Sequence, residues 1–254
     1  MGETSRERAG DRSLRYPPWL SEALGGELST WELQALTREG GQAEVWMARS
    51  GRARRVARRL HHRPGLAAER DAMLAWNAAV GSAIPAVLAA NAAEGWSVVE
   101  AVDGTLVAEL DPDDLRRPSV YRQLGEIRRR ALEIPIPADS MSTQDAMRRR
   151  VEATLARIAG DPEAGMTAHA PSLRAFLATD HSRLQRVACH RDLGEHNLIL
   201  DGEGRLHLID FGRAAPDFLL VDLVPSRLDV WPGRPDLQRA FEDGFWASLD
   251  EDAR

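Results

Sequence analysis

The sequence of 254 residues contains no lysine, so all 33 of its basic residues are arginines. Cysteine occurs once, at Cys189, which excludes an internal disulfide framework and suits a reducing cytoplasm. No run of about 18 consecutive apolar residues exists, so no membrane-spanning helix is expected. The formal net charge of −6 argues against nucleic acid as the main partner, because phosphate backbones attract basic surfaces. We expect a cytoplasmic protein, a monomer or a homodimer, that binds neither nucleic acid nor membrane.

The first residues of the chain are also poor in apolar side chains. The stretch MGETSRERAGDRSLRYPPW is charged and lacks an apolar core, so it is not typical of a secretory signal. Residues 1–18 are expected to form a polar, mobile segment. The lone Cys189 lies beside His190, which raises a nucleophilic interpretation. A buried cysteine before a loop is more typical of inert packing, since reactivity requires a stabilised thiolate.

Turn signals and periodicity divide the rest of the chain into two parts. Residues 19–102 are interpreted as mainly short strands with one amphipathic helix, and residues 103–254 as mainly helical. The pair Asp103-Gly104 breaks the pattern and is interpreted as a hinge between two lobes. The predicted strands cover residues 31–36, 43–48, 55–60, 85–89 and 96–101, and the predicted helices cover residues 65–79, 118–132, 142–159, 171–185 and 235–249.

One short stretch of the second part, NLILDGEGRLHLI, predicts a β-hairpin. Residues 197–200 and 205–209 alternate as strands do, and Asp201-Gly202-Glu203-Gly204 is a turn signal between them. Folding this hairpin is expected to pair Leu200 with Arg205. The two ends of the hairpin then lie next to each other.

Polar side chains gather at that end of the hairpin. Asn197 follows Asp192 by five positions, and Asp210 returns to within a residue or two of Asn197 when the hairpin folds. An aspartate on a loop can orient and deprotonate a hydroxyl, and an amide and a carboxylate nearby can hold Mg²⁺ through hard oxygen ligands. Phosphoryl transfer needs this set, because its catalysis is mostly positioning and charge neutralisation.

The same stretch resembles the protein-kinase-like superfamily. His190-Arg191-Asp192 is followed by Asn197 and then by Asp210-Phe211-Gly212, which together match the superfamily's catalytic and metal-binding motifs. Only residues 213–254 remain beyond this point, with no Ala-Pro-Glu sequence, whereas residues 105–189 leave room for three helices before the catalytic loop.

That distribution resembles the aminoglycoside phosphotransferase family of small-molecule kinases. The resemblance covers roughly residues 31–250 and is strongest at residues 189–223. There the segment from Asp217 to Leu223, with Asp222 inside it, is similar to the family's G-D-P-x-x-D-L element. The family usually has H-G-D where this chain has H-R-D.

The resemblance implies an α+β, two-lobed protein-kinase-like fold, with an antiparallel sheet and a helix in the first lobe and a mainly helical second lobe with a catalytic hairpin. It implies that Asp192 is the catalytic base, or at least the residue that orients the acceptor hydroxyl, and that Asn197 and Asp210 bind Mg²⁺. His190 would buttress the loop through hydrogen bonds, and Asp222 would hold the loop through backbone amides. Phe211 would pack in the core and orient Asp210.

The first lobe is expected to bind the nucleotide. The turn at Gly40-Gly41-Gln42 could bring its amides close to phosphate, because glycine has no side chain there. The strand Val56-Ala57-Arg58-Arg59-Leu60 has arginines where the superfamily usually has its lysine. Arg58 and Arg59 point to opposite faces, so only one can enter the cleft, and the sequence does not decide which. Glu69 is the expected partner of that arginine, and Glu100, before the hinge, completes the predicted nucleotide-binding set.

The resemblance implies transfer of phosphate from ATP or GTP to a hydroxyl of a small molecule, with an antibiotic as the first candidate. Two alternatives stay open: an atypical small protein kinase, and a pseudokinase that binds nucleotide weakly because the lysine is missing. Acceptor contacts are expected between the inserted helices and the final segment. The candidates for these contacts are Asp217, Asp229, Trp231 and the acidic run from Asp111 to Asp114.

Overall fold

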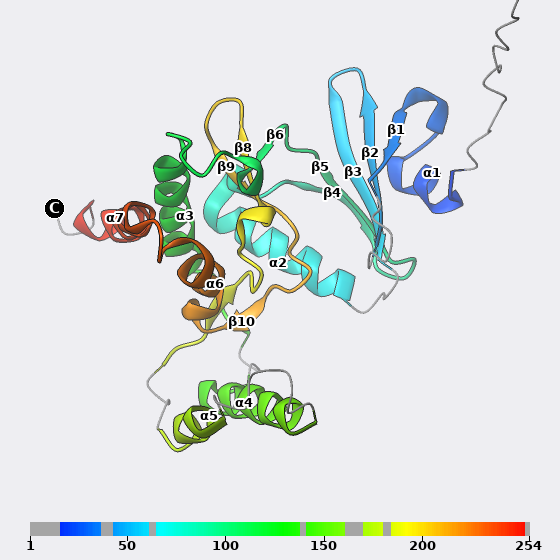
Figure 1. Ribbon diagram of the computed structural model, residues 1–254. Helices are drawn as coiled ribbons and strands as arrows, with labels where there is room; N and C mark the ends of the chain where they lie inside the picture. The colour runs from blue at the N-terminus through cyan, green and yellow to red at the C-terminus, as the bar shows by residue number, and fades with distance from the viewer. Residues whose placement is uncertain are drawn as a thin grey trace, which may run out of the picture.

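The protein is known from a computed structural model, which describes residues 16–36, 43–60, 65–137, 141–160, 170–179 and 184–251. Residues 1–15 of the expected N-terminal segment and the whole Gly40-Gly41-Gln42 turn lie outside the described residues. Among the described helices, none has the length and hydropathy that a bilayer crossing requires. Figure 1 shows two lobes, with a sheet and helix α1 in one and most of the helices in the other.

The first lobe is built on a five-stranded antiparallel sheet with the order β1-β2-β3-β5-β4. Its strands are β1 Glu32–Ala35, β2 Ala43–Ser50, β3 Ala53–Leu60, β4 Val87–Asn91 and β5 Trp96–Glu100. Two helices, α1 (Pro18–Leu24) and α2 (Gly65–Val80), cover opposite faces of this sheet (Figure 1). The alternation of strand side chains explains this, because Val98 packs against α1 whereas Val99 packs in the core that contains α2.

The second lobe contains two small sheets. Strand β6 (Gly104–Leu106) pairs with β8 (Leu198–Asp201), which pairs with β9 (Leu206–Leu208), and β7 (Val187–Cys189) pairs with β10 (Ala215–Asp217). Its helices are α3 Arg117–Ala131, α4 Thr143–Gly160, α5 Ala170–Leu177, α6 Leu219–Pro225 and α7 Pro235–Glu251. The shorter helical turns of both lobes are η1 Leu28–Thr30, η2 Gly81–Ala83, η3 Val107–Glu109, η5 Glu195–Asn197 and the π-helical η6 Ser226–Val230.

The predicted α+β fold with an antiparallel sheet, a helix and a helical second lobe is confirmed. The residue ranges assigned to the two lobes stay a prediction. The expected helix at 171–185 is wrong at its end, since α5 stops at Leu177 and residues 184–186 have no regular structure.

The predicted pairing within the hairpin is also wrong by one residue. Leu200 pairs with Leu206 instead of Arg205. The carboxylate of Asp201 accepts hydrogen bonds from the backbone N–H groups of Glu203 and Arg205, at 2.9 and 2.8 Å. These bonds hold Arg205 within the turn, so the second strand begins one residue later than its alternation indicated.

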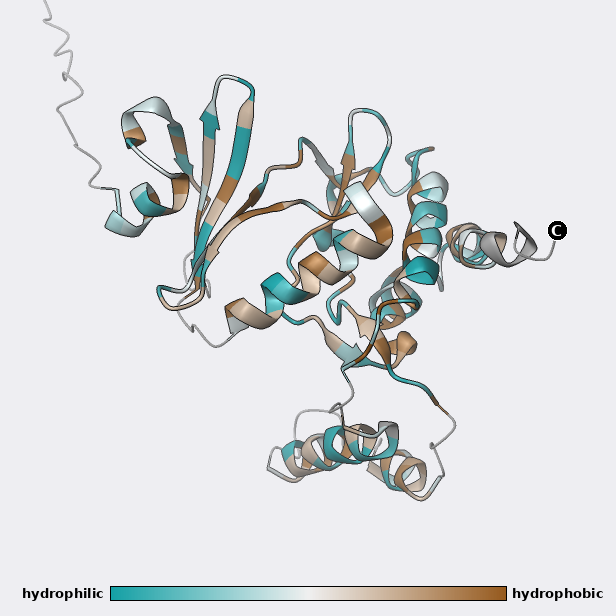
Figure 2. Cartoon of the chain, turned by 180° about the vertical axis from the view of Figure 1, so that it is seen from behind, coloured by the Kyte–Doolittle hydropathy of each residue, from teal (hydrophilic) through white to brown (hydrophobic). Residues whose placement is uncertain are grey.

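The core of the molecule lies between α2, α3, α7 and the hairpin. Fully buried side chains from all four meet there, among them Trp76, Tyr121, Leu208 and Leu237. In Figure 2 the hydrophobic residues run along β5 and the short helix α6. This core therefore contains side chains of the first lobe as well as of the hairpin and helices of the second lobe.

Two glycines allow α3 and α7 to cross closely. A Cβ on Gly244 of α7 would overlap the backbone carbonyl of Arg122 and lie 3.1 Å from its Cα. A Cβ on Gly125 of α3 would lie 2.7 Å from the backbone nitrogen of Phe245. Because both neighbours are backbone atoms, they cannot move aside as a flexible side chain can.

We therefore expect Gly244→Ala to lower the free energy of unfolding by about 1–3 kcal/mol, the usual cost of overpacking. The loss should occur although alanine forms helices better than glycine by about 1 kcal/mol. Urea unfolding measures it. The matched control is Gly160→Ala at the end of α4, where no heavy atom lies within 4 Å of the added Cβ, and which should be neutral or slightly stabilising. A Gly244→Ala protein as stable as the unmutated one would contradict the close crossing.

Candidate active site

Asp192 and Asn197 are tied together within the loop that joins β7 to β8. The Asn197 side-chain amide donates a hydrogen bond to the backbone carbonyl of Asp192, at 2.8 Å. This bond orients the buried Asn197 so that its Oδ1 stays available as an acceptor or ligand. The Asp192 carboxylate is about one-third exposed, at 32 %, and lies 3.6 Å from His196 Nε2. A hydroxyl-bearing ligand can therefore reach Asp192.

The hairpin brings Asp210 back to this loop, as the sequence predicted. The backbone N–H of Ile209 donates to the carbonyl of Asn197, at 3.0 Å, so Asp210 directly follows a residue bonded to Asn197. Asp210 has φ +62°, a conformation that non-glycine residues seldom adopt, and its side chain is 56 % exposed. Strain of this kind is typical of functional positions.

The structure decides between the two arginines of β3. The Arg58 guanidinium forms an ion pair with the buried Glu69 of α2, and its other terminal nitrogen lies 3.5 Å from Asp210 Oδ1. Arg59 points to the opposite face and contacts Glu94, at 4.0 Å between charged groups. Strand alternation explains this, because Ala57 faces α1 and its neighbour Arg58 must face the other way.

Burial of the Arg58 guanidinium lowers its pKa, and the Asp210 carboxylate opposes that effect. Arginine begins from so high a pKa that it stays charged in this setting. A largely buried cation therefore lies between Glu69 and Asp210, where the superfamily usually has its lysine.

A carboxylate on α6 anchors the loop between β7 and β8. Asp222 is fully buried and accepts hydrogen bonds from the backbone N–H groups of His190 and Arg191, at 3.0 and 2.6 Å. This is the arrangement that the resemblance implied for Asp222. The buried Arg128 of α3 pairs with Asp222, at 3.4 Å, and donates to the carbonyl of Ala188, at 3.0 Å.

An aromatic cluster supports the same loop. The rings of His190, Phe211 and Trp76 meet edge to face, with centroids 4.5 Å apart for His190–Phe211 and 5.4 Å for Trp76–Phe211. His190 Nε2 lies 2.9 Å from the carbonyl of Ile209. Burial lowers the pKa of His190, so the ring is neutral and donates its N–H to that carbonyl. His190 thus buttresses the loop, as the resemblance implied.

Sequence reasoning missed a second anchor, at Glu195. This loop carboxylate forms an ion pair with Arg117 and accepts a hydrogen bond from the Tyr121 hydroxyl, at 2.7 Å. Burial, and then the neighbouring Glu195, raise the pKa of Tyr121, so the phenol stays protonated and donates. Helix α3, far from the motif in sequence, supplies Arg117, Tyr121 and Arg128. The only sequence signal for them is an amphipathic pattern in which arginine occupies positions that are otherwise apolar.

Other predicted residues do not join this group. Glu100 pairs in register with Arg55 and lines a separate hollow formed with residues 101–103 and the hairpin turn. Burial raises the pKa of the Cys189 thiol to about 12, and the thiol donates to the carbonyl of Phe218, so it packs instead of reacting.

The residues predicted to contact the acceptor differ in burial and in partners. Trp231 lies in the core against Phe241, and Asp114 pairs with Arg116. Asp229 is exposed, and Asp217 is buried between arginines.

The oxygen atoms at the end of the hairpin suit a hard divalent cation. No group of three or more His, Cys, Asp and Glu side chains capable of holding a metal occurs among the described residues. Asp210 and Asn197 nevertheless supply one exposed carboxylate and one oriented amide oxygen, on backbone positions that the hairpin brings together. Mg²⁺ typically takes one or two protein oxygens and completes its shell with water and phosphate. This donor set fits that pattern.

Comparison with known proteins gives one family. The sequence profile of the phosphotransferase enzyme family matches residues 35–252. No curated protein is similar enough in sequence to count as a match.

Solved structures share the fold. The chain is similar to an aminoglycoside-3'-phosphotransferase of type VIII, with 20 % identity, a TM-score of 0.63 and 87 % of each chain covered. It is similar to the macrolide 2'-phosphotransferase MphH from Brachybacterium faecium, with 16 % identity, a TM-score of 0.64 and coverage of 85 % of this chain and 77 % of that one. A thermostable mutant of aminoglycoside phosphotransferase APH(4)-Ia, solved with ADP and hygromycin B, has 16 % identity and a TM-score of 0.64, with 87 % and 79 % covered.

The lowered pKa of His190 predicts a pH dependence of stability. As the pH falls through about 6.5, the unfolded chain takes up a proton on this histidine and the folded chain does not. The free energy of unfolding should therefore decrease from pH 7.5 to pH 5.5, with a contribution of up to about 1.4 kcal/mol per pH unit from this residue.

Urea unfolding across that pH range measures the effect. His190→Asn should show a shallower slope than the unmutated protein, and the control His196→Asn, at an exposed histidine of the same loop, should keep the full slope. Equal slopes in all three proteins would contradict a buried, neutral His190.

Proposed function

The chain belongs to the phosphotransferase enzyme family, and from that membership we propose that it transfers the γ-phosphate of ATP or GTP to a hydroxyl of a small molecule. The observation that carries this proposal is the group formed by Arg58, Glu69, Asp210, Asn197 and Asp192, in which an ion pair on one lobe meets the loop and hairpin of the other. An antibiotic is the proposed acceptor, since similar structures include phosphotransferases named for aminoglycosides and for a macrolide. The proposed setting is the cytoplasm, as a monomer or a homodimer.

Each residue has a defined part in the proposed reaction. Asp192 orients the acceptor hydroxyl and takes its proton as the oxygen forms a bond to the γ-phosphorus and the bond to the nucleoside diphosphate breaks. Arg58, held by Glu69, contacts the phosphates with a forked cation that spans two oxygens. Asn197 and Asp210 would hold Mg²⁺, which would neutralise charge on the triphosphate.

The residues that would carry out the transfer favour an active enzyme over the pseudokinase alternative. A chain that only bound nucleotide would not require an accessible Asp192 beside an oriented Asn197, and both are present together with Asp210. The segment after the hairpin favours a small-molecule acceptor over a protein. Its last helix, α7, packs against α3, so it does not extend outward as a platform for a protein substrate.

The test is phosphate transfer measured by mass spectrometry. The protein is incubated with Mg²⁺, ATP or GTP and a panel of hydroxylated antibiotics, and a phosphate-sized gain in mass identifies the acceptor. We expect Asp192→Asn to lower turnover by about 10²–10⁴-fold, the usual contribution of a general base, with nucleotide binding nearly unchanged.

The matched control is Glu203→Gln, the same carboxylate-to-amide change at an exposed position of the hairpin turn. It should leave turnover at the level of the unmutated protein. Full turnover in Asp192→Asn would refute the role of this residue, and phosphate gain on proteins alone would favour the protein-kinase alternative.

The two arginines of β3 should respond differently to alanine. Arg58→Ala should raise the dissociation constant of the nucleotide and cut turnover sharply, because it removes a buried, charge-assisted contact and leaves Glu69 unpaired. Arg59→Ala should change stability by less than about 0.5 kcal/mol and activity hardly at all, since its guanidinium faces away from Glu69 and Asp210 and interacts with the partly exposed Glu94.

Nucleotide titration and steady-state kinetics on the two variants measure this difference. Arg58→Lys separates charge from shape, because it keeps the cation and removes the fork. We expect it to lose activity. Equal and negligible effects of both alanine variants would show that neither arginine contacts the phosphates.

A further inference from the structure

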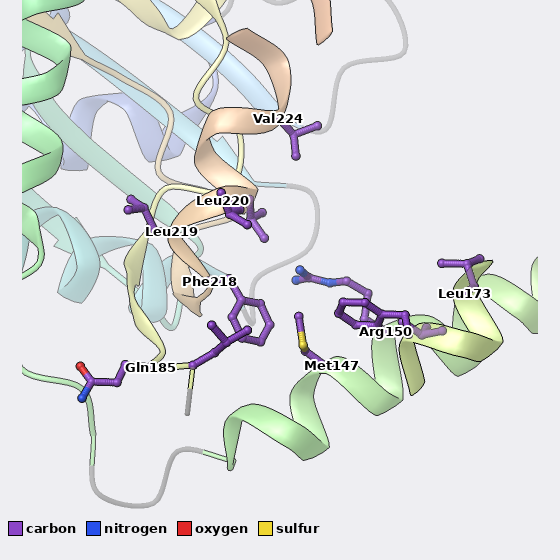
Figure 3. A pocket seen from close by; sticks show the side chains of 12 residues that line it. Met147, Arg150, Leu173, Gln185, Phe218, Leu219, Leu220 and Val224 are labelled. Carbon is purple, nitrogen blue, oxygen red and sulfur yellow. The ribbon is translucent and has the colours of Figure 1, made fainter. Parts of the chain in front are cut away.

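A cavity of about 410 Å³ lies between the α4–α5 pair and α6, and its walls are apolar (Figure 3). Met147 and Val151 come from α4, and Leu173 and Phe176 come from α5. Phe218 directly precedes α6, and Val224 lies near its end. Its volume lies within the range of about 300–1,000 Å³ that is usual for small-molecule sites. Resting on the proposed function, we propose that this cavity receives the body of the acceptor, which is an uncharged, largely apolar small molecule that carries a hydroxyl.

The charges around the cavity disfavour a polycationic acceptor. Arg150 is the one charged side chain among the described residues that line it, and no carboxylate lines it among them. The guanidinium of Arg150 pairs with Asp217, which also pairs with Arg191, at 3.1 Å. One carboxylate thus faces two cations, so this edge of the cavity keeps a net positive charge. An aminoglycoside with several ammonium groups would find repulsion there and no compensating anion.

One wall of the cavity is hydrogen-bonded to the segment that carries the proposed base. Phe218, in its wall, accepts a hydrogen bond at its carbonyl from the Cys189 thiol, three residues before Asp192. Asp217 holds Arg191, the residue next to Asp192, in a conformation with φ +66° that non-glycine residues seldom adopt. A molecule bound between α4 and α6 therefore contacts a segment, Asp217-Phe218, that is bonded to Cys189 and Arg191. These two residues flank His190 in the chain segment that leads to the proposed base, Asp192.

Exposed apolar side chains mark the same place. Leu184, Leu220 and Val224 all line the cavity and are all exposed, Leu220 at 67 %. Apolar surface of this kind is stabilised when a ligand covers it, because burial removes it from water. Leu228, at 70 % exposure, lies about one helical turn beyond Val224 and does not line the cavity. It therefore provides a matched control for Leu220.

The experiment measures binding apart from turnover. The uncharged fluorescent probe N-phenyl-1-naphthylamine is titrated into the full-length protein, and then into Leu220→Asp and Leu228→Asp. We expect Leu220→Asp to raise the dissociation constant of the probe about tenfold or more, since it replaces apolar surface with a charge. Leu228→Asp should leave it unchanged. Both positions are exposed, so neither change should prevent folding.

Acceptor choice is then tested with chloramphenicol, which is uncharged, aromatic and hydroxylated, and with hygromycin B, which is polycationic. We expect chloramphenicol, and not hygromycin B, to displace the probe and to gain phosphate, with a higher KM in Leu220→Asp. Phosphorylation of hygromycin B with the same KM in both proteins would overturn the apolar acceptor and leave the proposed function standing. Probe binding that is insensitive to Leu220→Asp would also overturn it. Probe binding and displacement as expected, without phosphate gain on any compound, would uphold the apolar site and refute the proposed function.

Discussion

The buried ion pair between Arg128 and Asp222 is the contact on which the geometry of the catalytic loop depends. Neither side chain is exposed, and Asp222 holds the loop by accepting two of its backbone N–H groups. A buried charge is stable only when it is paired and hydrogen-bonded, so this carboxylate cannot take another position without leaving Arg128 uncompensated. Arg128 also lies over the ring of Trp76, 5.1 Å from its centroid, so the pair is fastened to the core of the molecule.

Helix α2 carries this constraint to the other lobe. Trp76 packs against Phe211 and Arg128 at one point of the helix, and Glu69, two turns earlier, pairs with Arg58 of the sheet. The residue before Phe211 is Asp210, which also faces Arg58. One helix therefore sets the distance between the proposed phosphate contact and the proposed metal ligand, because both ends are packed against it.

The side of the molecule that we propose for the acceptor is built differently. The α4–α5 pair faces α6 across a mostly apolar cavity (Figure 3). Arg150 of α4 also forms an ion pair with Asp217. At the α3–α7 crossing, in contrast, a Cβ added to Gly125 or Gly244 would overlap backbone atoms of the other helix. The loop fixed by buried charges thus lies beside the cavity that we propose for the acceptor.

The sequence alone predicts the hairpin, the spacing of Asp192, Asn197 and Asp210, and the α+β fold, because these follow from local alternation, turn residues and a motif contained in one short stretch. It could not choose between Arg58 and Arg59, since both faces of β3 are covered and only the positions of α1 and α2 distinguish them. It also could not find Arg128, Arg117 or Tyr121, because the loop residues that they contact, Ala188 and Glu195, lie 60 or more residues away along the chain. The tertiary structure decided these points for a physical reason: the energy of a buried charge depends on which partner the fold brings to it.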